Sequence, residues 1–155
     1  MSRIYDVLAD KYILRVGGQC IGVKKMSKLL DSIKKAGVFF VATADGDEPH
    51  VRPFGAVEEI DGKIYLVTGN KKAVFRQFIA NPKIEFAGIY ADGSWIRVSG
   101  RVRRTDDIKL KEKYLELRPT LQKIYKADDG IFEVFELVEP VGYIYSGTNV
   151  TKIEG

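Results

Sequence analysis

The order of apolar and polar positions along the chain predicts mostly short β-strands with a few helices among them. Apolar runs of strand length, bounded by turn-forming residues, occupy residues 37–44, 50–60, 63–68, 83–91, 94–103, 132–137 and 141–145. Apolar residues three or four positions apart, which are typical of helices, recur in residues 26–33, 74–79 and 106–125. Strands that are mostly linked by hairpins, with helices beside them, indicate an α+β fold that is mainly β, a small β-barrel flanked by helices.

The strand segments differ in the burial that they predict. Residues 37–44 are continuously apolar, as in a strand covered on both faces. Two Asp-Gly pairs, at 61–62 and 92–93, favour positive φ angles and therefore predict tight hairpin turns. The segment after the second pair alternates, with Ile96 and Val98 on one face and Trp95, Arg97 and Ser99 on the other.

Capping residues set the expected limits of the helices. The apolar stripes are Met26, Leu29, Leu30 and Ile33 in the first helix, and Val74, Phe75, Phe78 and Ile79 in the second. Ser27 is placed to cap the first helix and Gly37 to end it. The second should end at an Asn-Pro pair at 81–82, because a residue before proline avoids helical angles. The third spans residues 106–125 and is interrupted at Pro119.

Composition excludes several classes of protein. The 155 residues, of which 45% are hydrophobic and 30% charged, suit one globular domain. No apolar stretch is long enough to cross a bilayer and no secretory signal is recognisable, so we expect a soluble, cytoplasmic protein with no membrane partner. A single cysteine, Cys20, and a single histidine, His50, support neither a disulfide nor a zinc cluster. The net charge of +4 is scattered among 21 acidic residues, so nucleic acid is not an expected partner.

Residues 1–25 are the least regular part of the chain. Two short apolar runs flank Gly17 and Gly18, which favours a small hairpin, although a loosely held extension fits as well. We therefore divide the chain into an N-terminal extension or hairpin, residues 1–25, and a main domain, residues 26–155.

The segment from His50 to Lys72 carries the strongest chemical signal. A strand leads through Thr68 into Gly-Asn-Lys-Lys at the start of a helix, where unpaired backbone N–H groups attract anions. Thr68, Asn70, Lys71 and Lys72 are therefore candidates to bind one phosphate together. The same residues also fit an ordinary surface loop with two solvated lysines, and the local sequence does not distinguish these interpretations.

Six motifs follow one another between residues 26 and 146. They are Arg52-Pro-Phe-Gly, Asp61-Gly-Lys-Ile-Tyr-Leu-Val-Thr, Asn70-Lys-Lys, Asn81-Pro, Trp95-Ile-Arg-Val-Ser-Gly and Asp129-Gly-Ile-Phe-Glu-Val-Phe. In this order they resemble the pyridoxamine 5'-phosphate oxidase-like flavoproteins, and within them the nitroimidazole-reductase-like branch. The resemblance implies an FMN-binding split β-barrel that forms a homodimer and holds FMN in clefts between the two subunits.

The resemblance also implies roles for individual residues. Arg52 would reach the FMN phosphate or ribityl chain, and the backbone at Pro53 and Phe54 would follow the isoalloxazine edge. Val67 and Thr68 would line the same cleft, with the phosphate held by Asn70, Lys71 and Lys72. Trp95 would either stack near the flavin or fill the dimer core.

The function that we expect is electron transfer from NAD(P)H to a small planar acceptor, such as a nitroaromatic or a quinone. FMN would supply the redox chemistry, and no catalytic side chain is required. Residues 143–155 lack the Trp and Arg side chains that hold the vitamin phosphate in true pyridoxamine 5'-phosphate oxidases, so we do not expect vitamin oxidation. The alternatives are flavin storage or sensing without turnover, or binding of a deazaflavin or haem on the same fold.

Of three further features, the first two each have a structural as well as a functional interpretation. His50 fits a proton donor beside the flavin or a surface residue after a turn. The arginines that follow Trp95 fit steering of an anionic substrate or the solvated face of an edge strand; they are Arg97, Arg101, Arg103 and Arg104. The apolar segments 132–137 and 143–145 carry more aromatic surface than one small core needs, which favours dimerisation.

Overall fold

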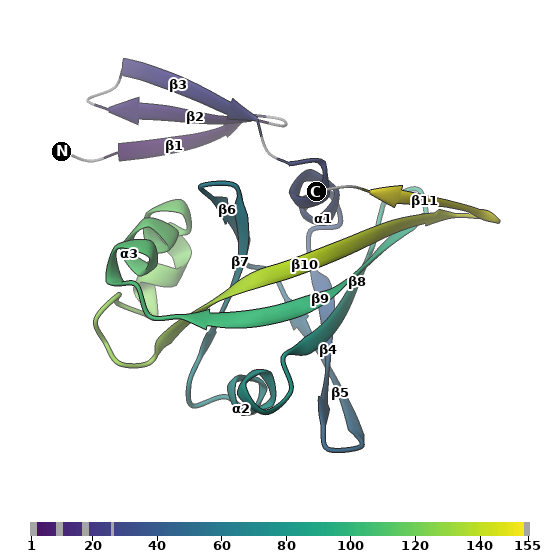
Figure 1. Cartoon of the computed structure of the whole chain (residues 1–155). Helices are drawn as coiled ribbons and strands as arrows, with labels where there is room; N and C mark the ends of the chain where they lie inside the picture. The colour runs from purple at the N-terminus through teal and green to yellow at the C-terminus, as the bar shows by residue number, and fades with distance from the viewer. Residues whose placement is uncertain (1–2, 9–10, 17–18, 26, 154–155) are drawn as a thin grey trace.

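The computed structural model of the chain describes residues 3–8, 11–16, 19–25 and 27–153, with side chains from Ser27 onward. The described residues form two antiparallel sheets and three α-helices (Figure 1). The larger sheet curves into a split β-barrel, as the strand pattern predicts.

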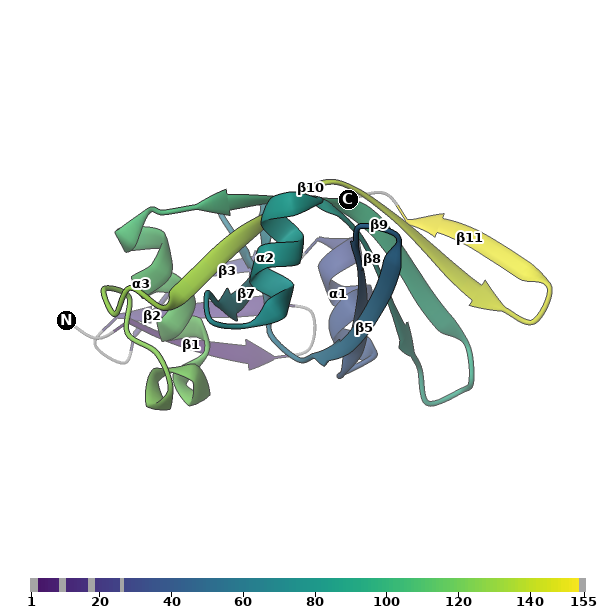
Figure 2. The same ribbon diagram turned by 90° about the horizontal axis from the view of Figure 1, so that it is seen from below.

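The strands of the larger sheet follow one another in the order β5-β4-β8-β9-β10-β7-β6, with β11 paired to one end of β10. Their bounds are β4 (Phe39–Asp45), β5 (Glu48–Phe54), β6 (Val57–Ile60), β7 (Lys63–Gly69), β8 (Lys83–Ile89), β9 (Trp95–Thr105), β10 (Phe132–Ser146) and β11 (Asn149–Ile153). All neighbours are antiparallel. Figure 2 shows β10 and β11 extending away from the barrel together.

Tight turns join several of these strands where the Asp-Gly pairs predict them. Between β6 and β7, Asp61 and Gly62 have φ angles of 53° and 80°, so both central residues of the turn are left-handed. That conformation matches the twist of a two-residue hairpin. Gly93 has a φ angle of 82° in the turn between β8 and β9. Both Asp-Gly predictions are confirmed.

Three α-helices and a short 3₁₀ helix accompany the barrel: α1 (Lys28–Lys35), α2 (Ala73–Ala80), α3 (Ile108–Leu117) and η1 (Pro119–Lys123). The Ser27 hydroxyl accepts a hydrogen bond from the Leu30 N–H at 3.2 Å, which confirms the predicted cap of α1. Asp107 caps α3 in the same way. Helix α2 has no side-chain cap at its first turn and ends at Asn81, before Pro82.

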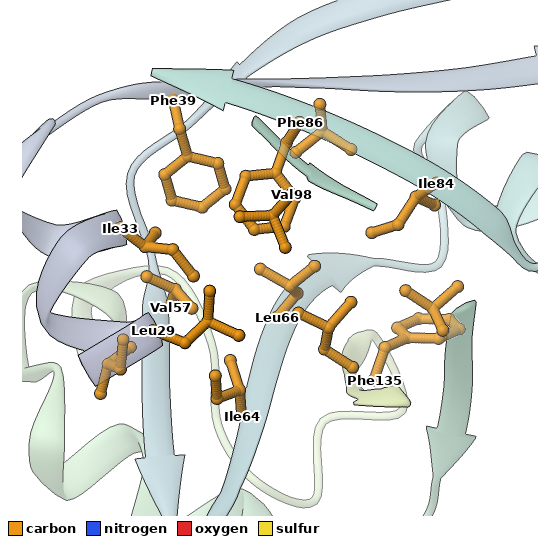
Figure 3. Close-up of a cluster of buried hydrophobic side chains, with 14 of the residues drawn as sticks. Leu29, Ile33, Phe39, Val57, Ile64, Leu66, Ile84, Phe86, Val98 and Phe135 are labelled. Carbon is orange, nitrogen blue, oxygen red and sulfur yellow. The ribbon is translucent and has the colours of Figure 1, made fainter. Parts of the chain in front are cut away.

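The core has two parts, one on each side of the strand β7. The first lies inside the curved sheet beneath α1, where Leu29 and Ile33 face Phe39 and Phe86 (Figure 3). The second lies under α3 and includes Tyr114, Phe132 and Val134. Because consecutive residues of a strand point to opposite faces, β7 supplies Ile64 and Leu66 to the first part, and Tyr65 and Val67 to the second.

Strand β4 is not covered on both faces, in contrast to the prediction for residues 37–44. Val41 and Phe39 are buried, whereas Phe40 between them is 52% exposed. The outer face of β4 is therefore apolar without a covering layer in the described chain.

Two predictions for the later strands are also wrong. Residues 132–137 and 141–145 form one strand, β10, that bends at an irregularity between Val138 and Val141. The arginine-rich strand β9 lies between β8 and β10, so it is not an edge strand. Arg103 and Arg104 pair with Glu136 and Glu133 across the β9–β10 ladder, and this pairing accounts for two of the four arginines.

The N-terminal residues form a separate three-stranded sheet. Its strands are β1 (Arg3–Leu8), β2 (Lys11–Val16) and β3 (Gln19–Lys25), in that order. Strands β2 and β3 flank the expected Gly17-Gly18 turn, which lies outside the described residues, as does Met26 of the predicted α1 stripe. The sequence pattern did not predict β1 as a third strand.

Candidate cofactor site

A pocket of about 210 Å³ lies between the edge strand β5, the end of β7 and the start of α2. It is lined by Arg52, Pro53, Phe54, Gly55, Ala56, Val67, Thr68, Lys72, Val74, Leu121 and Tyr125. The fold thus brings together six of the nine residues that the sequence suggests for a cofactor site. They are Arg52, Pro53, Phe54, Val67, Thr68 and Lys72.

Arg52 is held in place by three neighbours behind the pocket. Its Nη1 donates to the carbonyl oxygen of Val41 at 3.1 Å and to the hydroxyl of Thr43 at 2.7 Å. Its Nη2 donates to Oε1 of Gln77 at 2.8 Å. Burial lowers the pKa of Arg52 from its ordinary value, yet a guanidinium remains charged at any physiological pH. The pocket therefore has a fixed positive charge on one wall.

Thr68 contributes a hydroxyl that lacks a partner. The residue is 3% exposed, and its Oγ1 makes no hydrogen bond to any described residue. A buried hydroxyl without a partner is costly, so such groups in folded proteins usually bind water, an ion or a ligand. Thr68 therefore brings a buried hydroxyl without a partner to the lining of the pocket.

Lys72 adds a second cation at the start of α2. It is the N-cap residue of this helix, is exposed, and offers no side-chain cap to the first turn. The N–H groups of an uncapped first turn carry partial positive charge and favour an anion. Arg52, Thr68 and Lys72 together present the types of donor that a phosphate prefers.

Three of the predicted residues do not line this pocket: Asn70, Lys71 and Trp95. The Asn70 Nδ2 donates to the carbonyl oxygen of Gly130 at 2.6 Å, so its side chain ties the end of β7 to the loop before β10. Lys71 is exposed beside the pocket. Trp95 stacks on Tyr145 with ring centroids 4.1 Å apart and lines a different, apolar depression of about 430 Å³ with Phe40 and Ile89.

Four of the residues that shape the site were not predicted from the sequence. Thr43 and Gln77 hold Arg52, and both are at least 95% buried. Leu121 and Tyr125 form another wall, because η1 folds back toward β7 after Pro119. A polar residue within the apolar pattern of α2 was the available signal for Gln77, whereas Leu121 and Tyr125 are distant in sequence and carried none.

The pocket is small for an organic cofactor. Sites that enclose a drug-sized ligand usually measure about 300–1,000 Å³, more than the pocket provides. Its lining combines apolar surface, from Phe54, Val67 and Val74, with two cations and a hydroxyl. These residues fit part of a planar, phosphate-bearing group such as a flavin nucleotide, and the pocket of this chain is too small to enclose all of it.

Neither a metal-binding cluster nor a membrane-spanning helix is found among the described residues. No group of three His, Cys, Asp or Glu side chains within them is arranged to hold a metal ion. No helix among them is long and apolar enough to span a bilayer. His50 is exposed on β5, two residues before Arg52, and does not line the pocket.

The architecture and the pocket define a split-barrel protein with a candidate ligand site at a strand edge and a helix start. The family model described as pyridoxamine 5'-phosphate oxidase matches residues 26–138. The chain therefore belongs to the pyridoxamine 5'-phosphate oxidase family, as its motifs suggest. The match begins after the N-terminal sheet.

Solved structures agree with this assignment. A NimC/NimA family protein from Clostridium acetobutylicum is 43% identical, with a TM-score of 0.78, over 81% of this chain and 89% of that chain. A heme binding protein from Mycobacterium smegmatis has a TM-score of 0.63 at 14% identity, over 78% of this chain and 54% of that chain. A FAD-binding protein from Mesorhizobium loti has a TM-score of 0.53 at 18% identity, over 77% of this chain and 94% of that chain. The last two show a shared fold only. Among curated proteins no match was found.

Proposed function

We propose that the protein is an FMN-binding flavoprotein. The observation that carries the proposal is the partnerless buried hydroxyl of Thr68 in a pocket whose charged groups are Arg52 and Lys72. Two cations and a hydroxyl suit a phosphate, and the apolar lining suits a flat ring system. The FAD-binding and heme-binding proteins of the same fold make FAD and haem the competing ligands.

The proposed site is completed by a second copy of the chain. Four apolar side chains on and beside β4, β5 and β8 are more than half exposed: Val38, Phe40, Val51 and Ile89. Three of them, Val38, Phe40 and Ile89, line one depression, and an exposed apolar surface of this kind is typical of an interface. The segment 132–137, which first suggested dimerisation, is instead mostly buried within its own core. A homodimer that covers the outer face of β4 would also supply the walls that the small pocket lacks, and Trp95 of the partner subunit is our candidate for one of them.

The proposed activity is electron transfer from NAD(P)H to a small planar acceptor. When bound, FMN supplies the redox chemistry, while the protein binds the cofactor, orients it and sets the charge around it. The roles proposed for this chain are to fix the phosphate with Arg52, Thr68 and Lys72 and to exclude water with Phe54 and Val67. The resemblance of the motifs to the nitroimidazole-reductase-like branch makes nitroaromatics the first acceptors to examine.

One set of measurements tests this proposal. The purified protein should show flavin absorbance or acquire it on addition of FMN, and the melting temperature should rise. A ligand at a hundred times its dissociation constant adds about 2.7 kcal/mol to the free energy of unfolding. FMN should also quench the fluorescence of Trp95, the only tryptophan of the chain. A haem spectrum in place of a flavin spectrum would select the competing ligand, and the absence of any spectral or thermal change would refute the proposal.

Turnover is tested separately from binding. Oxidation of NADH and NADPH by the FMN-loaded protein should accelerate when a nitroaromatic or quinone is added. FMN binding without any acceptor-dependent oxidation would leave storage or sensing as the function.

A further inference from the structure

Gln77 lies where an apolar residue is expected. It is on the inner face of α2, is 3% exposed, and is flanked by Phe78, which packs in the core. Buried polar side chains are retained at a cost unless they are hydrogen-bonded. The Gln77 Oε1 accepts from the Thr43 hydroxyl at 2.7 Å and from Nη2 of Arg52 at 2.8 Å. Its carbonyl oxygen is therefore fully used, and one of its partners is a wall of the pocket.

The directions of these hydrogen bonds are determined by chemistry. A guanidinium only donates, so Thr43 Oγ1 must accept from Arg52 and can use its own proton for Gln77. The three side chains form a closed triangle in which Gln77 is the final acceptor. Loss of that acceptor would leave donors of both Thr43 and Arg52 unmatched, and the guanidinium would lose its orientation.

The triangle also decides which edge of Arg52 is available to a ligand. A guanidinium has five N–H donors. Val41 and Thr43 accept from the two N–H groups of Nη1, and Gln77 accepts from one of the two N–H groups of Nη2. Among the described residues, no partner is found for Nε–H or for the second Nη2–H. An Nε–H and an Nη2–H form one of the edges with which arginine binds carboxylate or phosphate in a bidentate manner.

We propose that Gln77 is a positioning residue that presents the Nε edge of Arg52 to an anionic ligand in the pocket. The proposal rests on the phosphate site proposed above and adds the residue that aligns it. Because Lys72 is the N-cap residue of α2, Gln77 links the two cations of the pocket through one short helix. Neither Gln77 nor Thr43 needs to touch the ligand.

The test compares FMN with riboflavin, which has the same ring but no phosphate. Gln77→Leu should raise the dissociation constant of FMN about tenfold and that of riboflavin less than twofold. Gln77→Glu should also weaken the binding of FMN more than that of riboflavin, because a carboxylate placed at Arg52 neutralises the charge that attracts the phosphate. Thr43→Val should behave like Gln77→Leu. Ile33→Val, a change in α1 away from the pocket lining, is the control for a general loss of stability.

A double-mutant cycle separates positioning from packing. In an Arg52→Ala background, Gln77→Leu should have no further effect on FMN affinity. An undiminished effect in that background, or equal losses for FMN and riboflavin, would overturn the proposal while leaving FMN binding by the parent protein intact. If the parent protein binds no FMN, the proposed function fails instead.

Discussion

The Thr68 hydroxyl has opposite consequences for the empty and the occupied pocket. A buried hydroxyl without a partner destabilises the free protein, but it gains a partner when a phosphate or ribityl group is bound. Thr68→Val should therefore raise the free energy of unfolding of the FMN-free protein by about 1 kcal/mol. The same change should weaken FMN binding about fivefold, roughly 1 kcal/mol. Urea unfolding and FMN titration of one variant measure both, and unchanged FMN affinity would show that the missing partner is not the cofactor.

Lys72 makes a simpler prediction, because it is exposed and has no ion-pair partner among the described residues. Lys72→Ala should weaken the binding of FMN by about 1.5–3 kcal/mol, as expected for the loss of a hydrogen bond to a charged group. Riboflavin, which lacks the phosphate, should be little affected. Lys71→Ala, one residue away and outside the pocket lining, is the matched control and should leave both affinities unchanged.

At the scale of single residues, local sequence patterns predicted where a helix begins better than they predicted which of its side chains are buried. The Ser27 cap follows from the neighbouring sequence, because the hydrogen bond that it makes spans three residues. Ile79, by contrast, belongs to the predicted apolar stripe of α2 but is 54% exposed, whereas Gln77 is buried. The difference depends on Arg52 and Thr43, which reach α2 from other strands. Helical periodicity alone does not contain that information.

Among the connecting elements, the loop between η1 and β10 depends on one carboxylate. The Asp129 side chain accepts from the backbone N–H groups of Lys126, Ile131 and Phe132 at 2.7–2.9 Å. Burial acts to raise the pKa of Asp129, but these donors outweigh it, and the pKa lies below its ordinary value of 3.8. A depressed pKa means that the folded state binds the proton less readily than the unfolded state does.

The stabilisation from Asp129 is therefore complete above the unfolded pKa and is lost as the pH falls through the folded one. Asp129→Asn should lower stability at pH 7 and flatten the decline of the melting temperature below about pH 4. Thermal unfolding from pH 2 to pH 7 measures this, and Asp128→Asn, its exposed neighbour, is the control. Identical acid profiles for Asp129→Asn and the parent protein would contradict the assignment.

Elements were predictable where one short segment determines them. The hairpin at Asp61 and Gly62 requires only two residues with positive φ, and these are readable from sequence. The continuity of β10 was not predicted, because Glu139 and Pro140 at its bend resemble a turn between two strands. Glu139 has a φ angle of 51°, and the strand continues beyond it because β9 pairs on both sides of the bend.

At the scale of the whole molecule, the apolar outer face of β4 bears on how many copies of the chain assemble. Residues 37–44 have the composition of a strand covered on both faces, although Phe40 is half exposed in the single chain. In the homodimer that we propose, a second copy would provide the missing layer. Phe40→Lys should therefore reduce the sedimenting mass from two chains toward one and weaken FMN binding. Ile108→Lys on α3, another exposed apolar position, should change neither. A stable monomer that binds FMN as tightly as the parent protein would refute the shared site.

Family membership alone does not decide the substrate. Residues 143–155 contain neither Trp nor Arg, the side chains that the family resemblance implies for holding a vitamin phosphate, so we expect the FMN-loaded protein to oxidise pyridoxamine 5'-phosphate slowly. A site that cannot pair a substrate's phosphate loses several kcal/mol of recognition. Peroxide release with pyridoxamine 5'-phosphate, compared with NADPH oxidation in the presence of a nitroaromatic, measures the preference. Rapid vitamin oxidation would contradict the proposed acceptor class.

The central place of β10 in the barrel has a consequence for synthesis on the ribosome. Until residues 132–146 emerge, β9 and β7 each lack a neighbour, and the sheet exists only as two pieces, β5-β4-β8-β9 and β7-β6. Each piece then presents an open strand edge to other nascent chains. We expect translation arrested before Phe132 to yield insoluble or chaperone-bound chains, and arrest well beyond Ser146 to yield protease-resistant ones.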